Sequence, residues 1–257
     1  MRIAVLLKEV PDTYSDREMN LETGLTDRSG DVVADEVSER AVEAALRIAE
    51  AGEGIEVEIL SVGPESAADS VRRGIAMGAS EAYIVSDEAL TGADVTLTAQ
   101  VLAKLVEKQG YDLVVAGGMS SDGAAGVVAP FVAELLGWPV LTNLTELSID
   151  GDSVRATQAS ENATAELSAQ LPAVVSVADG FADPRYPNFK GLMAAKKKEL
   201  RAVTLAELGV DPEDFTHPRA IMVGIERRPE RERGEIIDGS STAAARLVDF
   251  LESKNLI

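Results

Sequence analysis

Two apolar patterns alternate along the first part of the chain. Short apolar runs, typical of buried parallel strands, occupy 2–7, 55–62, 81–86 and 113–116. They alternate with longer segments that have apolar residues at helical spacing, over 35–51, 67–77, 94–108 and from 122 to the tryptophan at position 138. This alternation predicts a doubly wound, mainly parallel α/β sheet of the Rossmann-like class, with helices on both faces.

The pattern changes after this tryptophan. Short β-prone segments follow over 141–149, 152–158, 163–170 and 173–177. Asp150-Gly151-Asp152 has the residues of a hairpin turn. We therefore expect a β-rich addition to the sheet, antiparallel or mixed.

Two segments have few apolar residues and no clear period. Residues 12–34 form a long polar excursion, with a hairpin expected around 21–33, and such a loop in a compact domain is usually functional. Residues 201–257 are largely charged, with an amphipathic helix expected near the end, over 241–254. The sequence thus predicts an α/β domain over 1–200 and an extended C-terminal arm over 201–257, either mobile or bound along a partner.

The charge of the chain limits its partners. Acidic residues outnumber basic ones by 44 to 24, which gives a net charge of −20. Nucleic acids and anionic membranes would be repelled, so neither is expected as a partner. Adaptation to high salt is the favoured explanation of the acidity, and an acidic docking face stays open. The chain has no cysteine and no apolar run that could span a membrane, and its N-terminus resembles a strand rather than a signal peptide, so we expect a cytoplasmic location.

Catalytic side chains are scarce. The one histidine is His217, and without cysteine the usual metal clusters and the Cys–His or Ser–His–Asp arrangements are excluded. The basic run at 196–198 is typical of a solvated stretch, with contact to an anionic group as the alternative. These residues indicate a binding protein or carrier with no catalytic constellation of its own.

The loop after the fourth strand is the best candidate for a binding site. Gly117-Gly118 end the strand, and Ser120, Ser121 or Asp122 could cap the helix that follows. A strand, a glycine turn and a helix N-terminus direct backbone N–H groups towards a phosphate, and glycine lets the backbone approach it closely. The loop is neither GxGxxG nor a P-loop, so an ordinary strand–helix turn remains the alternative.

Six separated stretches resemble the beta subunit of the electron transfer flavoproteins (ETF). They are 5–12, 39–48, 72–85, 111–139, 171–176 and 183–198, which include VLLKEVPD, LPAVVS and DPRYPNFKGLMAAKKK. The resemblance spans essentially the whole chain. It implies an adenine-nucleotide-binding α/β domain and a C-terminal arm that wraps a partner, the ETF alpha subunit. A stand-alone universal-stress-like module is disfavoured by the arm and the DPRYP segment, and an ATP-using ligase by the missing P-loop.

The resemblance implies a function in electron transport. Such a heterodimer carries electrons from acyl-CoA or other flavin dehydrogenases to an acceptor similar to ETF-quinone oxidoreductase. FAD is held mainly by the alpha subunit, and the beta subunit holds AMP or, in electron-bifurcating members, a second FAD. Asp122-Gly123 and Pro130 resemble the bifurcating subset, but its Gln and Thr are missing here. AMP is slightly favoured because it needs fewer side-chain donors.

The resemblance also places the nucleotide contacts. They fall on Leu6, Asp35, Val62, Gly117, Gly118, Met119, Ser120, Ser121, Asp122, Gly123, Ala124, Ala125, Gly126, Val127 and Val128. Ala124, Gly126, Val127 and Val128 replace polar residues of the family. A phosphate here would therefore depend on backbone N–H groups and on the two serines.

A docking loop for partner dehydrogenases is implied as well. Its residues here are Phe181, Pro184, Arg185 and Tyr186. Phe181 takes the position of the family's apolar anchor, which predicts an exposed side chain that contributes strongly to binding. Packing under its own loop is the alternative.

Overall fold

The computed structural model describes residues 1–15, 17–231, 233–239 and 241–257, which form two compact units, Met1–Val223 and Gly224–Ile257.

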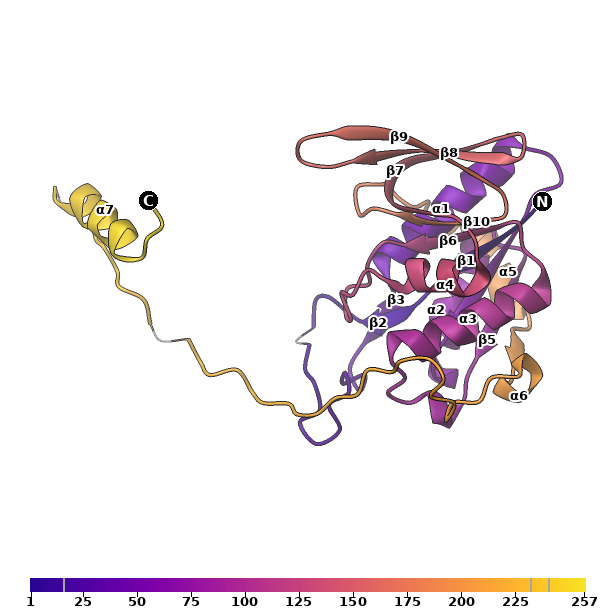
Figure 1. Ribbon diagram of the computed structural model, residues 1–257, viewed down its shortest axis with the longest axis horizontal. Coiled ribbons are helices and arrows are strands. Elements are labelled where there is room, and N and C mark those ends of the chain that lie inside the picture. Colours follow the sequence, from indigo (N-terminus) through magenta and orange to yellow (C-terminus); the bar gives the residue numbers. More distant parts are fainter. Residues whose placement is uncertain (16, 232, 240) are drawn as a thin grey trace. The chain divides into compact units, whose positions relative to one another are not determined.

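The first unit contains a large sheet (Figure 1). Its strands are β1 (Arg2–Leu6), β4 (Glu56–Val62), β5 (Glu81–Val85), β6 (Leu113–Gly117), β7 (Val140–Asp150), β8 (Ser153–Ala159), β9 (Thr164–Gln170), β10 (Ala173–Val177) and β11 (Arg201–Val203). Their order is β11-β5-β4-β1-β6-β10-β7-β8-β9. The strands are parallel from β11 to β7, and β7, β8 and β9 pair antiparallel, so the β-rich addition extends one edge of the sheet.

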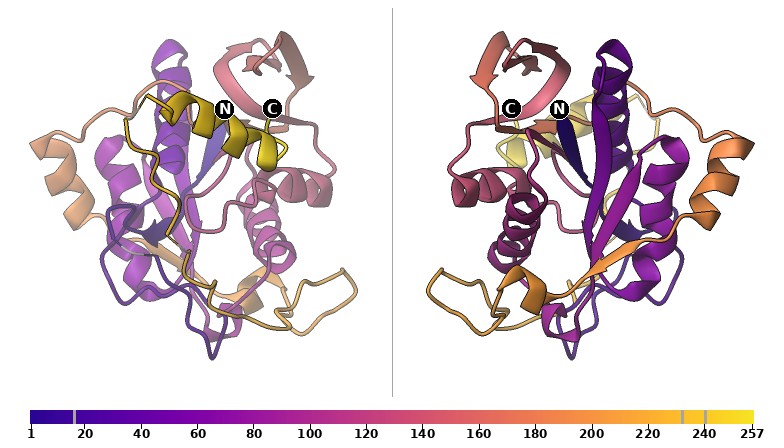
Figure 2. Two further views of the ribbon diagram at one scale, coloured as in Figure 1. Left: turned by 90° about the vertical axis from the view of Figure 1, so that its left-hand side faces the viewer. Right: turned by 90° about the vertical axis from the view of Figure 1, so that its right-hand side faces the viewer.

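Helices cover both faces of the sheet (Figure 2). One face packs against α1 (Glu36–Ala51), α2 (Ala68–Met77) and α5 (Phe189–Lys197), and the other against α3 (Val95–Gln109), α4 (Val128–Leu136) and α6 (Leu205–Leu208). Two short 3₁₀ helices, η1 (Glu65–Ala67) and η2 (Glu88–Leu90), lie in the loops after β4 and β5. In β1, Ile3 and Val5 join the first core while Ala4 and Leu6 join the second, because successive side chains point to opposite faces. The predicted doubly wound class is confirmed.

The excursion after β1 is closed at its base. β2 (Glu9–Pro11) pairs antiparallel with β3 (Val32–Ala34), and the N–H of Asp12 donates to the carbonyl of Asp31 over 2.9 Å. The sequence predicted a hairpin around 21–33. The two strands that pair are instead β2 and β3, which lie at the two ends of the excursion. Within the excursion, Met19 and Thr26 form an isolated bridge.

The first unit continues beyond residue 200, where the sequence placed the start of the arm. β11 pairs with β5, and α6 buries Leu205 and Leu208 in the second core. This segment therefore completes the edge of the sheet. The second unit contains α7 (Ala243–Ser253), within the helix expected over 241–254, and none of its described residues is buried.

Candidate nucleotide site at the carboxyl edge of the sheet

Three residues expected to contact a nucleotide lie at the tips of neighbouring strands. Leu6, Val62 and Gly117 are the last residues of β1, β4 and β6, which are adjacent in the sheet. Because the three strands are parallel, their carboxyl ends meet at one edge, where ligands of open α/β sheets bind. The side chain of Leu6 is buried in the core, so a ligand here can reach only its backbone.

The helix after this loop begins later than the sequence indicates. α4 begins at Val128, its N-cap residue is Val127, and no side chain caps it. The expectation that Ser120, Ser121 or Asp122 caps this helix is therefore wrong. Instead, Ala124 and Gly126 adopt left-handed backbone conformations, with φ of 48° and 67°, which interrupt a helical path.

Asp122 lies at the centre of a group of charged side chains. Its Oδ1 accepts hydrogen bonds from Lys8 Nζ at 2.6 Å, from Ser120 Oγ at 2.8 Å and from the N–H of Gly123 at 2.6 Å. Its Oδ2 accepts from Arg28 Nη2 at 2.9 Å. Burial acts to raise the pKa of Asp122, but the hydrogen bonds and charge of Lys8, with Ser120 and Gly123, hold that pKa below its ordinary value. The carboxylate thus stays charged and paired.

Asp35 joins the loop to the first helix. Its Oδ2 accepts from the N–H of Ser38 at 3.0 Å and so caps α1, which lies within the helical segment expected over 35–51. Its Oδ1 accepts from the N–H of Ser121 at 2.9 Å. The residue is only 1% exposed, so in this chain its carboxylate shapes the site and is not available to a ligand.

The glycine pair is required by close packing of the backbone. A Cβ on Gly117 would lie 3.0 Å from the carbonyl carbon of Val37, at the start of α1. A Cβ on Gly118 would lie 2.9 Å from the carbonyl oxygen of Val177. Both glycines are therefore needed to seat the loop against α1 and β10, whether or not a ligand is bound.

The middle of the loop is open to solvent. Residues 123–126 are exposed, and within the described part of the chain no hydrogen bond is recorded for the N–H groups of Ala125, Gly126 and Val127. Unpaired N–H groups before a helix are suited to an anion such as phosphate. Met119, earlier in the loop, is exposed, and Val127 and Val128 are half-buried.

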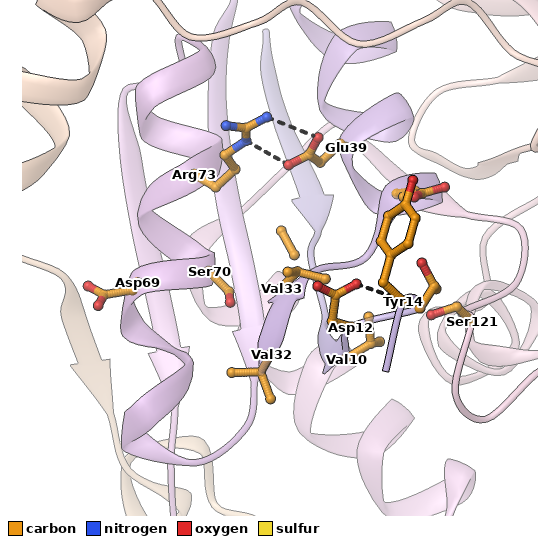
Figure 3. A pocket seen from close by; sticks show the side chains of 13 residues that line it. Val10, Asp12, Tyr14, Val32, Val33, Glu39, Asp69, Ser70, Arg73 and Ser121 are labelled. Carbon is orange, nitrogen blue, oxygen red and sulfur yellow. Dashed lines mark hydrogen bonds and ion pairs between the residues drawn. The ribbon is translucent and has the colours of Figure 1, made fainter. Parts of the chain in front are cut away.

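A separate cavity lies beside the loop (Figure 3). It measures about 510 Å³ and is lined by Val10, Asp12, Thr13, Tyr14, Val32, Val33, Ala34, Glu36, Glu39, Asp69, Ser70, Arg73 and Ser121. Its charged lining residues are four carboxylates and one arginine, and this Arg73 is paired with Glu39, with Nε 2.7 Å from Oε1, so the charge of the lining is net negative. An acidic cavity disfavours phosphate, and we assign the candidate nucleotide site to the exposed loop instead.

The docking loop differs from the sequence prediction at its key residue. Phe181 is only 6% exposed and belongs to the first core, so the expectation of an exposed anchor at this position is wrong. Arg40 holds the loop by donating to the carbonyl of Phe181 and to Asp183. Phe189, at the start of α5, is 79% exposed, and Tyr186 is also exposed.

Arg185 fixes the docking loop to α1. Its Nε lies 2.7 Å from Oε2 of Glu43, and its guanidinium also pairs with Glu50. Burial acts to raise the pKa of Glu43, but hydrogen bonds from Arg185 and Arg47 outweigh it, and the pKa is lowered. Pro184, next to this pair, is half-buried. Arg185 thus supports the loop. The ring of Tyr186 lies under the guanidinium of Arg73, whose carbon is 5.2 Å from the ring centre, whereas Phe189 is exposed and suited to a partner.

Two further findings apply to the described ranges alone. No group of three or more His, Cys, Asp or Glu residues there could hold a metal ion. None of the helices there has the length and apolar character needed to cross a membrane.

Fold and loop together define a Rossmann-like α/β protein with an elaborated loop at the carboxyl edge of its sheet. The model of the electron transfer flavoprotein domain matches residues 23–208, and the chain belongs to this family. It is 38% identical to the electron transfer flavoprotein subunit beta of Mycobacterium tuberculosis (strain ATCC 25618 / H37Rv), 39% to that of Mycobacterium leprae and 32% to that of Bacillus subtilis. These alignments cover 99% of this chain and 98–99% of the relatives. The resemblance to the beta subunit is thereby confirmed, and the stand-alone module and the ligase are not favoured.

Some residues around the site were not predicted from the sequence. Lys8 belongs to the VLLKEVPD motif, but nothing near it in the sequence indicates its pairing with Asp122. Arg17 donates to the carbonyl of Ser121, and Arg28 to Asp122, from an excursion without periodic pattern. Their role depends on contacts between distant segments, which only the fold reveals.

The start and the middle of the loop should respond differently to an added methyl group. Gly117→Ala should lower the free energy of unfolding by about 1–3 kcal/mol, because its Cβ would push on the backbone of α1. Gly123→Ala is the matched control: its Cβ would lie 3.6 Å from Ser120 Oγ, an ordinary contact, and should change stability by less than about 0.5 kcal/mol. Urea unfolding of both variants measures this, and equal losses would contradict the packing role of Gly117.

Proposed function

We propose that the chain is the beta subunit of a heterodimeric ETF and that its 117–128 loop binds an adenine nucleotide. The observation that carries the proposal is the run of N–H groups at 125–127 for which the described residues provide no partner, in the loop that follows the tip of β6, next to β1 in the sheet. FAD, held mainly by the alpha subunit, would supply the redox chemistry when bound. The heterodimer would carry electrons from acyl-CoA or other flavin dehydrogenases to a quinone oxidoreductase or similar acceptor. The cytoplasm is the proposed location.

AMP is the nucleotide we favour over a second FAD. The loop has only backbone donors between 124 and 128, because its side chains there are methyl, isopropyl or hydrogen. A single phosphate group can be held by a few N–H groups, whereas a pyrophosphate and a flavin ring need more partners. Asp122-Gly123 and Pro130 are the residues that favour the second candidate.

Counting the nucleotides tests this proposal. The chain is produced with its alpha subunit, the purified heterodimer is denatured, and the released nucleotides are separated by chromatography. One FAD and one AMP per heterodimer are expected. If two FAD and no AMP are released, the loop binds a second flavin nucleotide and not AMP. If one FAD alone is released, a nucleotide role for the loop is contradicted.

The C-terminal unit provides a second part of the proposal, the contact with the alpha subunit. Leu247, Val248 and Phe250 of α7 are exposed, and none of the described residues of this helix is buried. An apolar face of this kind is suited to the surface of another subunit.

Removing Gly224–Ile257 should abolish the heterodimer and leave the first unit folded. The truncation is placed at 224 because β11 and α6 belong to the first unit and would be lost with a break at 201. Size-exclusion chromatography with the alpha subunit measures complex formation, and circular dichroism checks the fold. A truncated chain that still elutes with the alpha subunit would rule out this role for the arm.

The docking surface for dehydrogenases is the third part. With Phe181 buried, we place the apolar anchor at Phe189, which lies at the start of α5 and is presented by the Asn188 cap, whose side chain accepts from the N–H of Gly191 at 2.9 Å. Exposed aromatic side chains on a rigid support contribute most of the energy of many interfaces.

Phe189→Ala should weaken the affinity for the dehydrogenase roughly thirtyfold, corresponding to about 2 kcal/mol, without changing flavin content or fold. The rate of ETF reduction at limiting dehydrogenase concentration measures this. Phe215→Ala, at another exposed phenylalanine, is the control and should leave the rate unchanged. An unchanged rate in Phe189→Ala would remove Phe189 from the interface.

A further inference from the structure

Two cations from outside the loop lie beside its exposed backbone. Lys8 follows β1, and Arg28 belongs to the excursion between β2 and β3. Both pair with Asp122, whose side chain is 3% exposed, whereas those of Lys8 and Arg28 are 42% and 31% exposed. The carboxylate is therefore enclosed, and the outer sides of both cations face solvent.

Lys8 is close to the open part of the loop. A Cβ on Gly123 would lie 3.7 Å from Lys8 Nζ, and Gly123 is the first of the exposed residues. Arg28 is held on two sides, since its Nη1 also donates to the carbonyl of Glu9 over 2.9 Å. The two cations therefore have fixed positions along the edge of the loop.

The charge balance at this edge is opposite to that of the protein. Three cations contact the loop, Lys8, Arg17 and Arg28. Two carboxylates contact it, Asp122 and Asp35, which leaves a net positive charge of one on a chain whose net charge is −20. The charged residues that line the neighbouring cavity are instead four carboxylates and one arginine. Within this region an anion is attracted to the loop and repelled from the cavity.

We propose that Lys8 and Arg28 contact the phosphate of the nucleotide bound by the 117–128 loop, with Asp122 holding both cations in place. The inference rests on the proposed nucleotide function of the loop and adds two residues, one of them from the 12–34 excursion, that the family resemblance did not assign. The backbone N–H groups at 125–127 and the two cations then supply the donors that the side chains at 124–128 lack. The excursion becomes one wall of the site.

The alternative is that the cations serve only to fold the loop around Asp122. The two roles are separable with a pair of ligands that differ by one phosphate, AMP and adenosine. A phosphate contact affects AMP alone, whereas a misplaced loop affects both ligands.

The test measures binding of AMP and of adenosine to the nucleotide-free heterodimer by titration calorimetry. Lys8→Met and Arg28→Met should each weaken AMP about tenfold or more and change adenosine by less than about threefold, since charge-assisted hydrogen bonds to phosphate are lost. Lys8→Arg keeps the charge and should retain most of the AMP affinity. Lys104→Met, which removes an exposed lysine of α3, is the control for net charge.

Two results would overturn the assignment: a parallel loss of AMP and adenosine in the Met variants, or no loss of either. Adenosine binding by each variant checks that the site is folded, and AMP affinity retained in Lys8→Arg would support a contact between the charge at position 8 and the phosphate. If the unaltered heterodimer releases no adenine nucleotide and binds no AMP, the nucleotide function of the loop fails and this assignment with it. If it binds AMP and the Met variants bind it equally well, only the cations are excluded.

Discussion

The buried carboxylate of Asp35 is the interaction on which the carboxyl edge of the sheet depends. It caps α1 through Ser38 and accepts from the N–H of Ser121, while its own N–H donates to the carbonyl of Lys8 over 2.9 Å. Chain segments that follow β1, precede α1 and follow β6 are thereby joined at one residue. A buried carboxylate is stable only when its acceptor positions are filled. The start of α1 and the path of the loop are therefore fixed together, and Gly117 is required because that path runs against α1.

Local signals were sufficient for most of the fold. Asp35, Asp94 and Thr204 each cap the helix that follows them, and the apolar runs coincide with the parallel strands. The path of the loop could not be predicted in this way. Asp122 is a residue type suited to an N-cap, but its carboxylate is taken by Lys8 and Arg28, which are 114 and 94 positions away in the sequence. A long-range ion pair therefore overrides a local capping signal, and no window of sequence contains both partners.

The docking loop shows the same limit for apolar residues. A single phenylalanine in a loop has no periodicity that would indicate whether it is buried. Arg40 and Arg185 fix the loop to α1, and Phe181 is enclosed beneath it. Phe189 is exposed at the start of α5, which is capped by Asn188. Recognising that cap in the sequence would have located the exposed residue, whereas the burial of Phe181 depends on two arginine contacts that span about half of the chain.

The chain as a whole is strongly acidic, with a net charge of −20, so the positive charge at the 117–128 loop requires an explanation. Few cations are present, and a loop of small apolar side chains contributes none, so the charge must come from elements that the fold brings there. Lys8 arrives with the central strand and Arg28 with the excursion, and both are held by a carboxylate that belongs to the loop itself. Because this carboxylate is enclosed and the cations are not, the edge is positive towards solvent although an acidic residue lies at its centre. The electrostatic character of the loop is thus a property of the tertiary structure, and the loop's own composition does not reveal it.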